Sequence, residues 1–253
     1  MTRPQIRRGA GRGLGRVSPF ALPGEGFFDR SEAALGAEAM RALAGAKVAV
    51  FGLGGVGGWC AEALARTGVG RLLVVDADRV APSNVNRQLV ALPETVGESK
   101  AELMRRRLLA ISPGAQIDAR DAFYDATTAA SFAIEECDCV VDAIDSLESK
   151  ARLILHALST PSVALFSSMG AARRRDPLKV RKAEFWKVKG DGLARALRSR
   201  FRRSGEFPQR KFQCVYSEEP PADCGMGSLV QVTAVFGMAL AAMVIDHLRT
   251  NKA

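Results

Sequence analysis

A glycine-rich stretch in the first quarter of the chain has the composition of a phosphate-binding turn. It reads Gly52-Leu53-Gly54-Gly55-Val56-Gly57 and lies between a short apolar run and a segment with helical spacing. Glycines let such a turn close tightly around phosphate oxygens, and the following helix N-terminus adds unpaired N–H donors and a positive dipole. Asp76 ends the next apolar run, where its carboxylate can accept hydrogen bonds from ribose hydroxyls. The sequence therefore predicts a nucleotide site with these contacts: Gly52, Gly54, Gly55, Gly57 and Asp76.

The glycine pattern alone is typical of redox dinucleotide sites, so an NAD-dependent oxidoreductase is the first interpretation that it leaves open. The chain contains no GxxxxGK[ST] phosphate loop. Polar residues farther along the chain favour a different chemistry. They are Asp78, the stretch Ser83-Asn84-Val85-Asn86-Arg87-Gln88, Lys100, and the stretch Asp142-Ala143-Ile144-Asp145-Ser146.

Arg87, Lys100 and Asp145 are residue types that suit a nucleotidyl transfer. Negative charge then grows on the α-phosphate and on departing pyrophosphate, whereas hydride transfer builds no phosphate charge. Arg87 offers a planar fork for phosphate oxygens and Lys100 a point charge, while Asp145 suits a magnesium ion that keeps most of its waters. Each also has an ordinary interpretation: a surface ion pair, a solvated helix-start lysine and a helix N-cap. The prediction therefore depends on their order and spacing.

These residues need a framework that brings them to one edge. Buried strands are predicted at 47–51, 71–75, 139–141 and 162–166, with another beginning at 117, and helices at 27–44, 59–67, 98–110 and 147–158. Alternating strands and helices predict an α/β fold with a doubly wound, mostly parallel sheet. Such sheets bind ligands at the carboxyl ends of their strands, where the candidate residues fall.

The net charge of +9 is concentrated in two places. Residues 1–26 carry five arginines before the first acid, and residues 173–211 carry 15 basic and 4 acidic residues. Local basicity of this kind indicates a polyanionic partner at one surface. We expect a disordered tail over 1–26, with a transit peptide as the alternative, an ATP-binding core over 27–170, and a basic lobe with a C-terminal helix packed on the core over 171–253.

The cysteines and the C-terminal apolar segment indicate where in the cell the protein is found. The five cysteines form no CxxC pair, which argues for a reducing compartment and against zinc. Residues 225–245 carry no charge and approach the length of a membrane span. Gln231 and Thr233 inside this stretch favour a buried core helix, and peripheral membrane contact is the alternative. We expect a cytoplasmic protein.

The order of GxGGxG, Asp, SNxxRQ, Lys and Asp resembles the core pattern of the adenylating superfamily of ThiF, MoeB and the ubiquitin-activating enzymes. The resemblance implies that Gly55 contacts ATP and Asp76 the ribose. It implies phosphate and metal contacts from Ser83 to Arg87, Lys100 and Asp145, and we include Asp78 and Ser146. It also implies a homodimer in which Arg30 reaches the phosphates of the other subunit; a surface residue at a helix start is the alternative.

Within this superfamily, residues 27–248 resemble the tRNA threonylcarbamoyladenosine dehydratase group. The specific stretches are Ser167 to Ala171, Asp176-Pro177, Leu193-Ala194-Arg195 and Val215 to Pro220. The similarity implies that ATP with Mg²⁺ adenylates the threonine carboxylate of threonylcarbamoyladenosine in tRNA, and that ring closure follows with loss of AMP. This route requires no protein nucleophile. We therefore interpret Cys214 as a small buried residue, with a thiol that transiently accepts the acyl group as the alternative.

The basic block supplies the expected RNA contacts, although a solvated cationic helix face is the ordinary interpretation. These contacts are Arg173, Arg174, Arg175, Arg198, Arg202 and Arg203. Gly190-Asp191-Gly192 departs from the group, in which Cys-Pro often stands at this point. Three alternatives stay open: adenylation of the C-terminal glycine of a ubiquitin-like sulfur carrier, with a sulfur-acceptor or cysteine desulfurase partner; an NAD-dependent oxidoreductase; and a non-catalytic RNA-binding protein.

Overall fold

The structure is a computed structural model that describes residues 26–251, apart from residues 224 and 226. The predicted basic tail lies outside the described residues, except for Gly26. Cys224 lies outside them as well.

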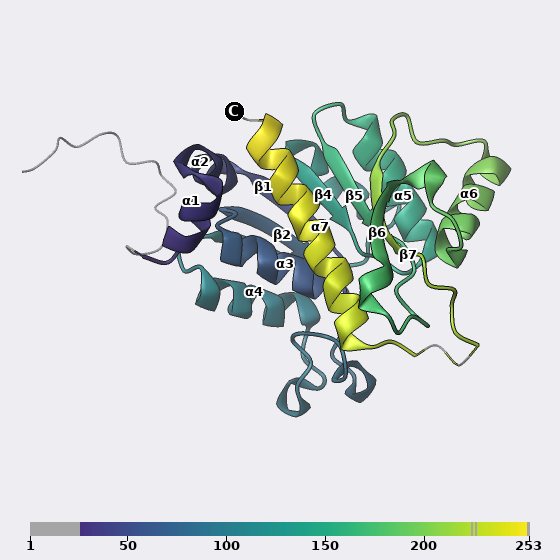
Figure 1. The fold of residues 1–253 in the computed structure, drawn as a ribbon, viewed down its shortest axis with the longest axis horizontal. Coiled ribbons are helices and arrows are strands. Elements are labelled where there is room, and N and C mark those ends of the chain that lie inside the picture. The colour runs from purple at the N-terminus through teal and green to yellow at the C-terminus, as the bar shows by residue number, and fades with distance from the viewer. Residues whose placement is uncertain (1–25, 224, 226, 252–253) are drawn as a thin grey trace, which may run out of the picture.

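A seven-stranded sheet forms the centre of the molecule, in the order β3-β2-β1-β4-β5-β7-β6 (Figure 1). All neighbouring strands are parallel except β6, which is antiparallel to β7. The doubly wound, mostly parallel sheet that the sequence predicted is therefore confirmed. The strands are β1 (Lys47–Phe51), β2 (Arg71–Val75), β3 (Gln116–Arg120), β4 (Cys139–Asp142), β5 (Ala164–Ser168), β6 (Val180–Glu184) and β7 (Gln213–Ser217).

The central strands are apolar along their whole length because helices cover both faces of the sheet. Every residue of β4 is buried, whereas β3, at the sheet edge, alternates between exposed and half-buried positions. β5 begins two residues later than predicted, because residues 160–162 form a turn before it.

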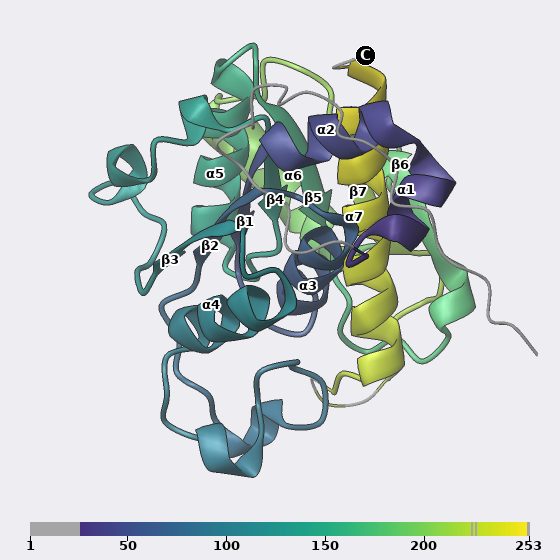
Figure 2. The same ribbon diagram turned by 90° about the vertical axis from the view of Figure 1, so that its left-hand side faces the viewer.

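Helices pack on both faces of the sheet (Figures 1 and 2). Residues of α2, α3, α4 and α7 share one hydrophobic cluster with the sheet, and residues of α5 and α6 share the other. The α-helices are α1 (Asp29–Leu35), α2 (Ala37–Gly45), α3 (Gly57–Thr67), α4 (Lys100–Ile111), α5 (Leu147–Ser159), α6 (Gly192–Ser204) and α7 (Val230–Asn251). The 3-10 helices are η1 (Pro82–Asn84), η2 (Pro93–Thr95), η3 (Ala129–Phe132), η4 (Ile134–Glu136), η5 (Pro177–Lys179) and η6 (Phe185–Lys187).

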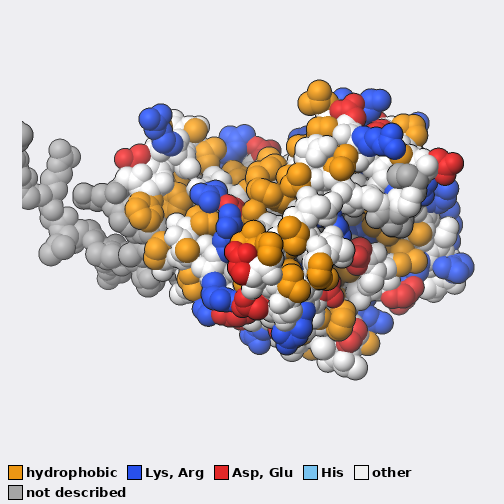
Figure 3. Space-filling model, turned by 90° about the horizontal axis from the view of Figure 1, so that it is seen from below, with side chains coloured by type: hydrophobic (Ala, Val, Ile, Leu, Met, Phe, Trp, Pro, Cys, Tyr) orange, Lys and Arg blue, Asp and Glu red, His pale blue; other side chains and the backbone are white. Residues whose placement is uncertain are grey.

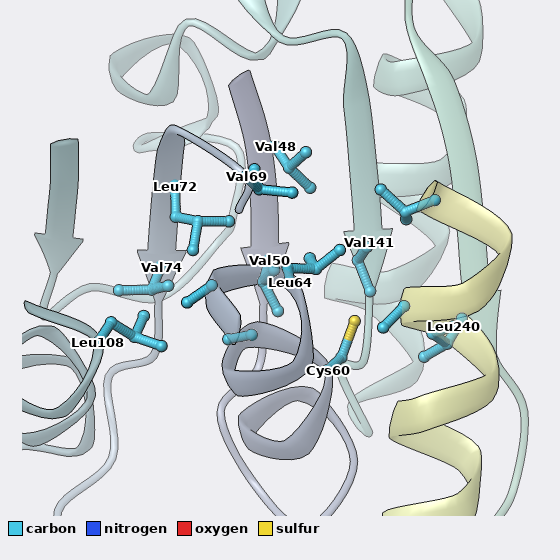
Figure 4. Packing of buried hydrophobic residues seen from close by; sticks show 14 of the residues in the cluster. Val48, Val50, Cys60, Leu64, Val69, Leu72, Val74, Leu108, Val141 and Leu240 are labelled. Carbon is cyan, nitrogen blue, oxygen red and sulfur yellow. The ribbon is translucent and has the colours of Figure 1, made fainter. Parts of the chain in front are cut away.

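Alternate residues of each strand enter opposite clusters because strand side chains point to opposite faces. Val48 and Val50 of β1 face the cluster that includes Cys60 and Leu64 of α3 (Figure 4). Ala49 and Phe51 of the same strand belong to the cluster with α5 and α6. The sheet is therefore fixed from both sides, which makes its carboxyl edge a rigid support for a site.

Strands β6 and β7 extend the same sheet rather than forming a separate one. β7 pairs with β5 through Phe166 to Ser168, and α6 packs beside α5. The predicted boundary near residue 170 therefore falls within one sheet, between strands β1 to β5 and strands β6 and β7.

Helix α7 crosses α3 at close range. A Cβ at Gly237 would lie 2.4 Å from the carbonyl oxygen of Val56, so only glycine permits this approach. Phe236, Leu240 and Val244 are fully buried in the core cluster. Residues 230–250 are long and apolar enough to cross a membrane, but this buried stripe fits the predicted core helix. Membrane contact stays a prediction.

Candidate active site

A pocket of about 670 Å³ opens at the carboxyl ends of the parallel strands. Segments that follow β1, β2, β4 and β5 line it, together with the N-termini of α4 and α6. β2 lies on one side of β1 in the sheet and β4 lies on the other, so the strand order reverses direction at β1. Open α/β sheets bind ligands at such a reversal point. The predicted site residues that line the pocket are Gly52, Gly54, Gly55, Asp76, Asp78, Asn84, Arg87, Lys100, Asp145 and Ser146.

The glycine turn joins β1 to α3 through very close backbone contacts. Gly52 has φ +86°, and a Cβ there would lie 2.6 Å from the carbonyl oxygen of Ala143. A Cβ at Gly57 would lie 1.8 Å from the carbonyl oxygen of Gly52. Gly57 does not line the pocket but allows the helix to pack on the turn, and its predicted contact with the nucleotide stays a prediction. Within the described residues, no protein acceptor receives the N–H groups of Gly54, Gly55 and Val56.

Asp76 closes the turn from the end of β2. One carboxylate oxygen accepts the N–H of Leu53 at 2.6 Å, and the other accepts the N–H of Asp78 at 2.8 Å. Burial raises the pKa of Asp76, while these two N–H donors oppose the shift by stabilising the charged form. A carboxylate has about four lone-pair positions, so about two remain for a ligand. This geometry suits ribose hydroxyls.

Lys100 points into the pocket from the first residue of α4. Its Nζ lies 2.8 Å from Oδ2 of Asp78, and the residue is only 4% exposed. The alternative of a solvated helix-start lysine is therefore wrong. Because the ammonium group has three donors, it can bind Asp78 and a phosphate oxygen at the same time.

Arg87 is held by the predicted motif that surrounds it. Its Nη1 donates to the carbonyl oxygen of Ser83 at 2.9 Å and to Oδ1 of Asn86 at 3.0 Å. Nδ2 of Asn86 in turn donates to the carbonyl oxygen of Ser228 at 2.9 Å. Ser83 and Asn86 do not line the pocket but orient Arg87, and their predicted contacts with the nucleotide stay a prediction. No ion pair of Arg87 exists within the described residues, so the surface ion pair is wrong.

Gln88 is a pocket residue that the predicted site omitted. Its side chain is 8% exposed, and its Oε1 has no hydrogen-bond partner within the described residues. Its place at the end of the SNxxRQ motif could have indicated that Gln88 belongs to the site. Phe123 and Tyr124 also line the pocket beyond β3. Because Phe123 and Tyr124 follow β3 at the same sheet edge as the other site residues, the sequence could have indicated that they line the pocket.

Asp145 and Ser146 are exposed in the loop after β4, whose shape a buried ion pair fixes. Nζ of Lys150 lies 2.8 Å from Oδ2 of Asp142 and donates to the carbonyl oxygen of Ile144 at 2.9 Å. Oδ1 of Asp142 accepts the N–H of Ile144 at 3.1 Å. Ser146, not Asp145, is the N-cap residue of α5, so the N-cap alternative for Asp145 is wrong.

The pocket continues beyond β5 toward α6. Asp191, the N-cap residue of α6, accepts the N–H groups of Gly170 at 3.0 Å and Ala194 at 2.8 Å. Arg174 lies 3.8 Å from Asp191 and also donates to the carbonyl oxygen of Glu219. Arg174 is only 3% exposed and lines the pocket, so it does not belong to an exposed basic surface, and its predicted RNA contact stays a prediction. It stabilises the wall of this half of the pocket.

The other predicted RNA contacts differ in exposure. Arg173 is half-buried, lines the pocket and donates to the carbonyl oxygen of Ala222 at 2.7 Å. Arg198 is half-buried and donates to the carbonyl oxygens of Phe185 and Val188, and its predicted RNA contact stays a prediction. The exposed members of the set are Arg175, Arg202 and Arg203.

Cys214 and Arg30 both lie away from the pocket lining. Cys214 is fully buried on β7, and burial raises the pKa of its thiol well above the usual value. These properties fit a packing residue better than an acyl-accepting thiolate. Arg30 is exposed on α1. Phe28, directly before α1, packs near Gly68. Gly68 follows the C-terminus of α3, and the glycine turn lies at the other end of that helix. Arg30 of this chain therefore lies away from the pocket, and its predicted contact with the phosphates of a second subunit stays a prediction.

Comparison with known proteins agrees with this geometry. The sequence model of the ThiF family matches residues 28–252. The chain belongs to the ThiF family. It is 41% identical over 194 residues to the tRNA threonylcarbamoyladenosine dehydratase of Bacillus subtilis. The aligned region covers 77% of this chain and 75% of the relative.

A solved structure from Escherichia coli has a similar fold. The tRNA N6-threonylcarbamoyladenosine dehydratase TcdA in complex with ATP matches with a TM-score of 0.82 and 33% identity, over 88% of this chain and 93% of that chain. An adenylyltransferase of another name is similar over less of the chain. The sulfur carrier protein adenylyltransferase of Thermus thermophilus is 36% identical over 46% of this chain and 42% of its own length.

Proposed function

We propose that the protein uses ATP to adenylate the threonine carboxylate of threonylcarbamoyladenosine in tRNA, and then closes a ring with release of AMP. The observation that carries this proposal is the composition of one pocket. It combines a glycine turn, a ribose acceptor, two cationic side chains and the carboxylate of Asp145, which has no protein partner among the described residues. The similarity to dehydratases also extends over both halves of this pocket, while the match to the sulfur carrier enzyme covers less than half the chain.

The nucleotide half of the pocket suits ATP. The N–H groups of the glycine turn bind phosphate oxygens, and the free lone pairs of Asp76 accept the ribose hydroxyls. Val75 and Phe123 offer apolar surface to the adenine. In the first step a carboxylate oxygen of the substrate attacks the α-phosphorus, and pyrophosphate leaves.

Arg87 and Lys100 stabilise the charge that grows in this step. Both lie in the pocket without needing to move far, because Ser83 and Asn86 hold Arg87 while Asp78 holds Lys100. Preorganised charges of this kind act mainly on the transition state, because they are already aimed when charge develops.

A magnesium ion fits beside Asp145. The described residues contain no group of three or more His, Cys, Asp or Glu that could hold a metal alone. Magnesium needs only one or two carboxylates when substrate phosphates supply further oxygens. Asp145 is exposed in the pocket and has no hydrogen bond or ion pair within the described residues, so it is available. When bound, the ion neutralises part of the charge on pyrophosphate.

The second step requires no nucleophile from the protein. A nitrogen of the substrate side chain attacks the activated acyl carbon, AMP departs, and the nitrogen loses its proton. Because this nitrogen is tethered to the acyl group, ring closure avoids the entropy of a bimolecular encounter. The burial of Cys214 supports this route over a thioester intermediate.

The wider assembly follows from the same proposal. Exposed arginines of the basic block, including Arg202 and Arg203, bind tRNA phosphates. A homodimer lets Arg30 of a second copy reach the pocket, and a role on tRNA places the protein in the cytoplasm. The proposal does not require a sulfur-acceptor partner or zinc.

The acceptor decides between this proposal and its sulfur carrier alternative. Pyrophosphate release from ATP and magnesium should be measured with three acceptors: tRNA carrying threonylcarbamoyladenosine, tRNA without the modification, and a ubiquitin-like protein ending in Gly-Gly. We expect release only with the modified tRNA. Release with the Gly-Gly protein alone would overturn the proposal, as would release that depends on no acceptor.

A further inference from the structure

Two exposed aromatic side chains lie next to each other at the α6 end of the molecule. Trp186 is 39% exposed and Phe207 is 50% exposed, and their ring centroids are 6.4 Å apart with a tilt of 35°. Neither ring lines the pocket. Large rings exposed in this way are costly to hydrate, so an adjacent exposed pair indicates a binding surface.

The platform formed by Trp186 and Phe207 stands on a rigid base. Phe185, directly before Trp186, is fully buried and stacks on Phe212 with centroids 4.8 Å apart. Arg198 of α6 places its guanidinium 5.6 Å from the centre of the Phe185 ring. Its two Nη atoms donate to the carbonyl oxygens of Phe185 and Val188 at 3.0 Å each. Arg198 therefore holds the turn that presents Trp186.

Cations outnumber acids in residues 184–211, the segment that carries this platform. The acids nearest in sequence are engaged: Glu206 pairs with Arg200, and Glu184 accepts the N–H of Trp186. Helix α6 itself contains no acid. Within residues 184–211, which the structure describes in full, the exposed cations without an ion pair are Lys187, Lys189, Arg195, Arg202, Arg203 and Lys211. Figure 3 shows Lys and Arg side chains along the end of the molecule where Figure 1 places α6.

Helix α6 connects this platform with the pocket. Its N-terminal residues Gly192 and Leu193 line the pocket, and Phe207 follows three residues after its last residue. A helix of 13 residues is about 20 Å long. Arg195 and Arg202 are seven residues apart and so lie on the same face, about 10 Å from each other along the axis.

We infer that Trp186 and Phe207 stack with unpaired bases of an RNA whose backbone follows α6 from the pocket. This inference rests on the proposed function, in which the modified nucleoside of the same RNA occupies the pocket. Aromatic rings stack on bases of any sequence, while neighbouring cations bind the phosphates between them. A duplex hides its base faces, so the platform selects a single-stranded loop. An acidic protein would use the cations but gain little from the rings.

Tryptophan fluorescence reports stacking directly, because the chain has two tryptophans and only Trp186 belongs to the platform. The full-length protein is titrated, without ATP, with an RNA hairpin that has an unpaired adenosine loop and with a blunt RNA duplex of equal length. We expect the hairpin to quench the emission and the duplex to leave it largely unchanged. Trp186→Phe removes this quenching but keeps an aromatic ring, so its affinity should change less than about threefold.

Leucine variants separate stacking from charge. Trp186→Leu and Phe207→Leu should each weaken hairpin binding about tenfold, with no change in the dependence of affinity on salt. Arg202→Gln with Arg203→Gln should instead lower the log–log salt slope by about one to two. Exposed positions make misfolding a minor concern, and unchanged melting temperatures check this.

Two results would overturn the inference: equal quenching by hairpin and duplex, or leucine variants that bind as well as the wild type. The proposed function is tested separately, by pyrophosphate release with modified tRNA. If that release is absent while the hairpin still quenches Trp186, the proposed function fails and the platform stands. If release occurs and Trp186→Leu binds normally, only the platform fails.

Discussion

Arg87→Ala is expected to lower AMP formation by at least about 10³-fold while leaving the fold intact. The guanidinium is aimed by Ser83 and Asn86, so its charge is in place before the α-phosphate is attacked. The residue is half-buried and makes no ion pair within the described residues, so its removal leaves no buried charge unpaired. The loss should therefore fall on kcat rather than on stability.

The measurement is single-turnover AMP formation with modified tRNA, together with the melting temperature of each variant. Asp145→Ala should show a similar loss that higher magnesium restores only in part. Arg105→Ala is the matched control, because Arg105 lies on α4 outside the pocket and pairs with Glu102 at the surface. Full turnover by Arg87→Ala, or an equal loss in Arg105→Ala, would remove the role assigned to Arg87.

Lys150→Met is expected to destabilise the protein by about 3–5 kcal/mol, because it leaves the carboxylate of Asp142 buried without its counter-charge. Both side chains are fully buried, and both bind the backbone of Ile144. The same change should loosen the loop that carries Asp145, so activity per folded molecule should fall as well.

Urea denaturation gives the free energy of unfolding, and the double variant Asp142→Asn with Lys150→Met is its control. The double variant buries no unpaired charge, so it should recover part of the stability lost by the single one. It should not recover activity, because Lys150 no longer holds the carbonyl oxygen of Ile144. Equal stability of Lys150→Met and the wild type would contradict the role of the pair.

Local sequence patterns were enough to predict strands β1 to β5, helices α1 to α5 and the edge where the site lies. Apolar runs mark buried strands, and the glycine turn marks the first crossover, because both signals depend on neighbours in the chain. The position of β7 between β5 and β6 was not predictable in this way, because strand pairing joins segments far apart in sequence.

The site was predicted less completely for the same reason. Lys150 and Arg174 are charged residues on ordinary-looking segments, and only their tertiary neighbours reveal that both are buried. Gly57 belongs to the glycine motif, but its role depends on how closely α3 approaches Gly52. The supporting role of Asn86 depends on Ser228, 142 residues away. Residue types and spacing identify the chemistry, and three-dimensional packing decides which residues perform it.

Nucleoside mass analysis tests the central claim most directly. tRNA bearing the open-chain modification is incubated with the protein, ATP and magnesium, then digested to nucleosides under mild conditions. The protein is expected to convert threonylcarbamoyladenosine to a product whose mass is lower by that of one water molecule. One AMP should form for each nucleoside converted. An unchanged nucleoside mass in the presence of bound ATP, or the same conversion without ATP, would contradict the account.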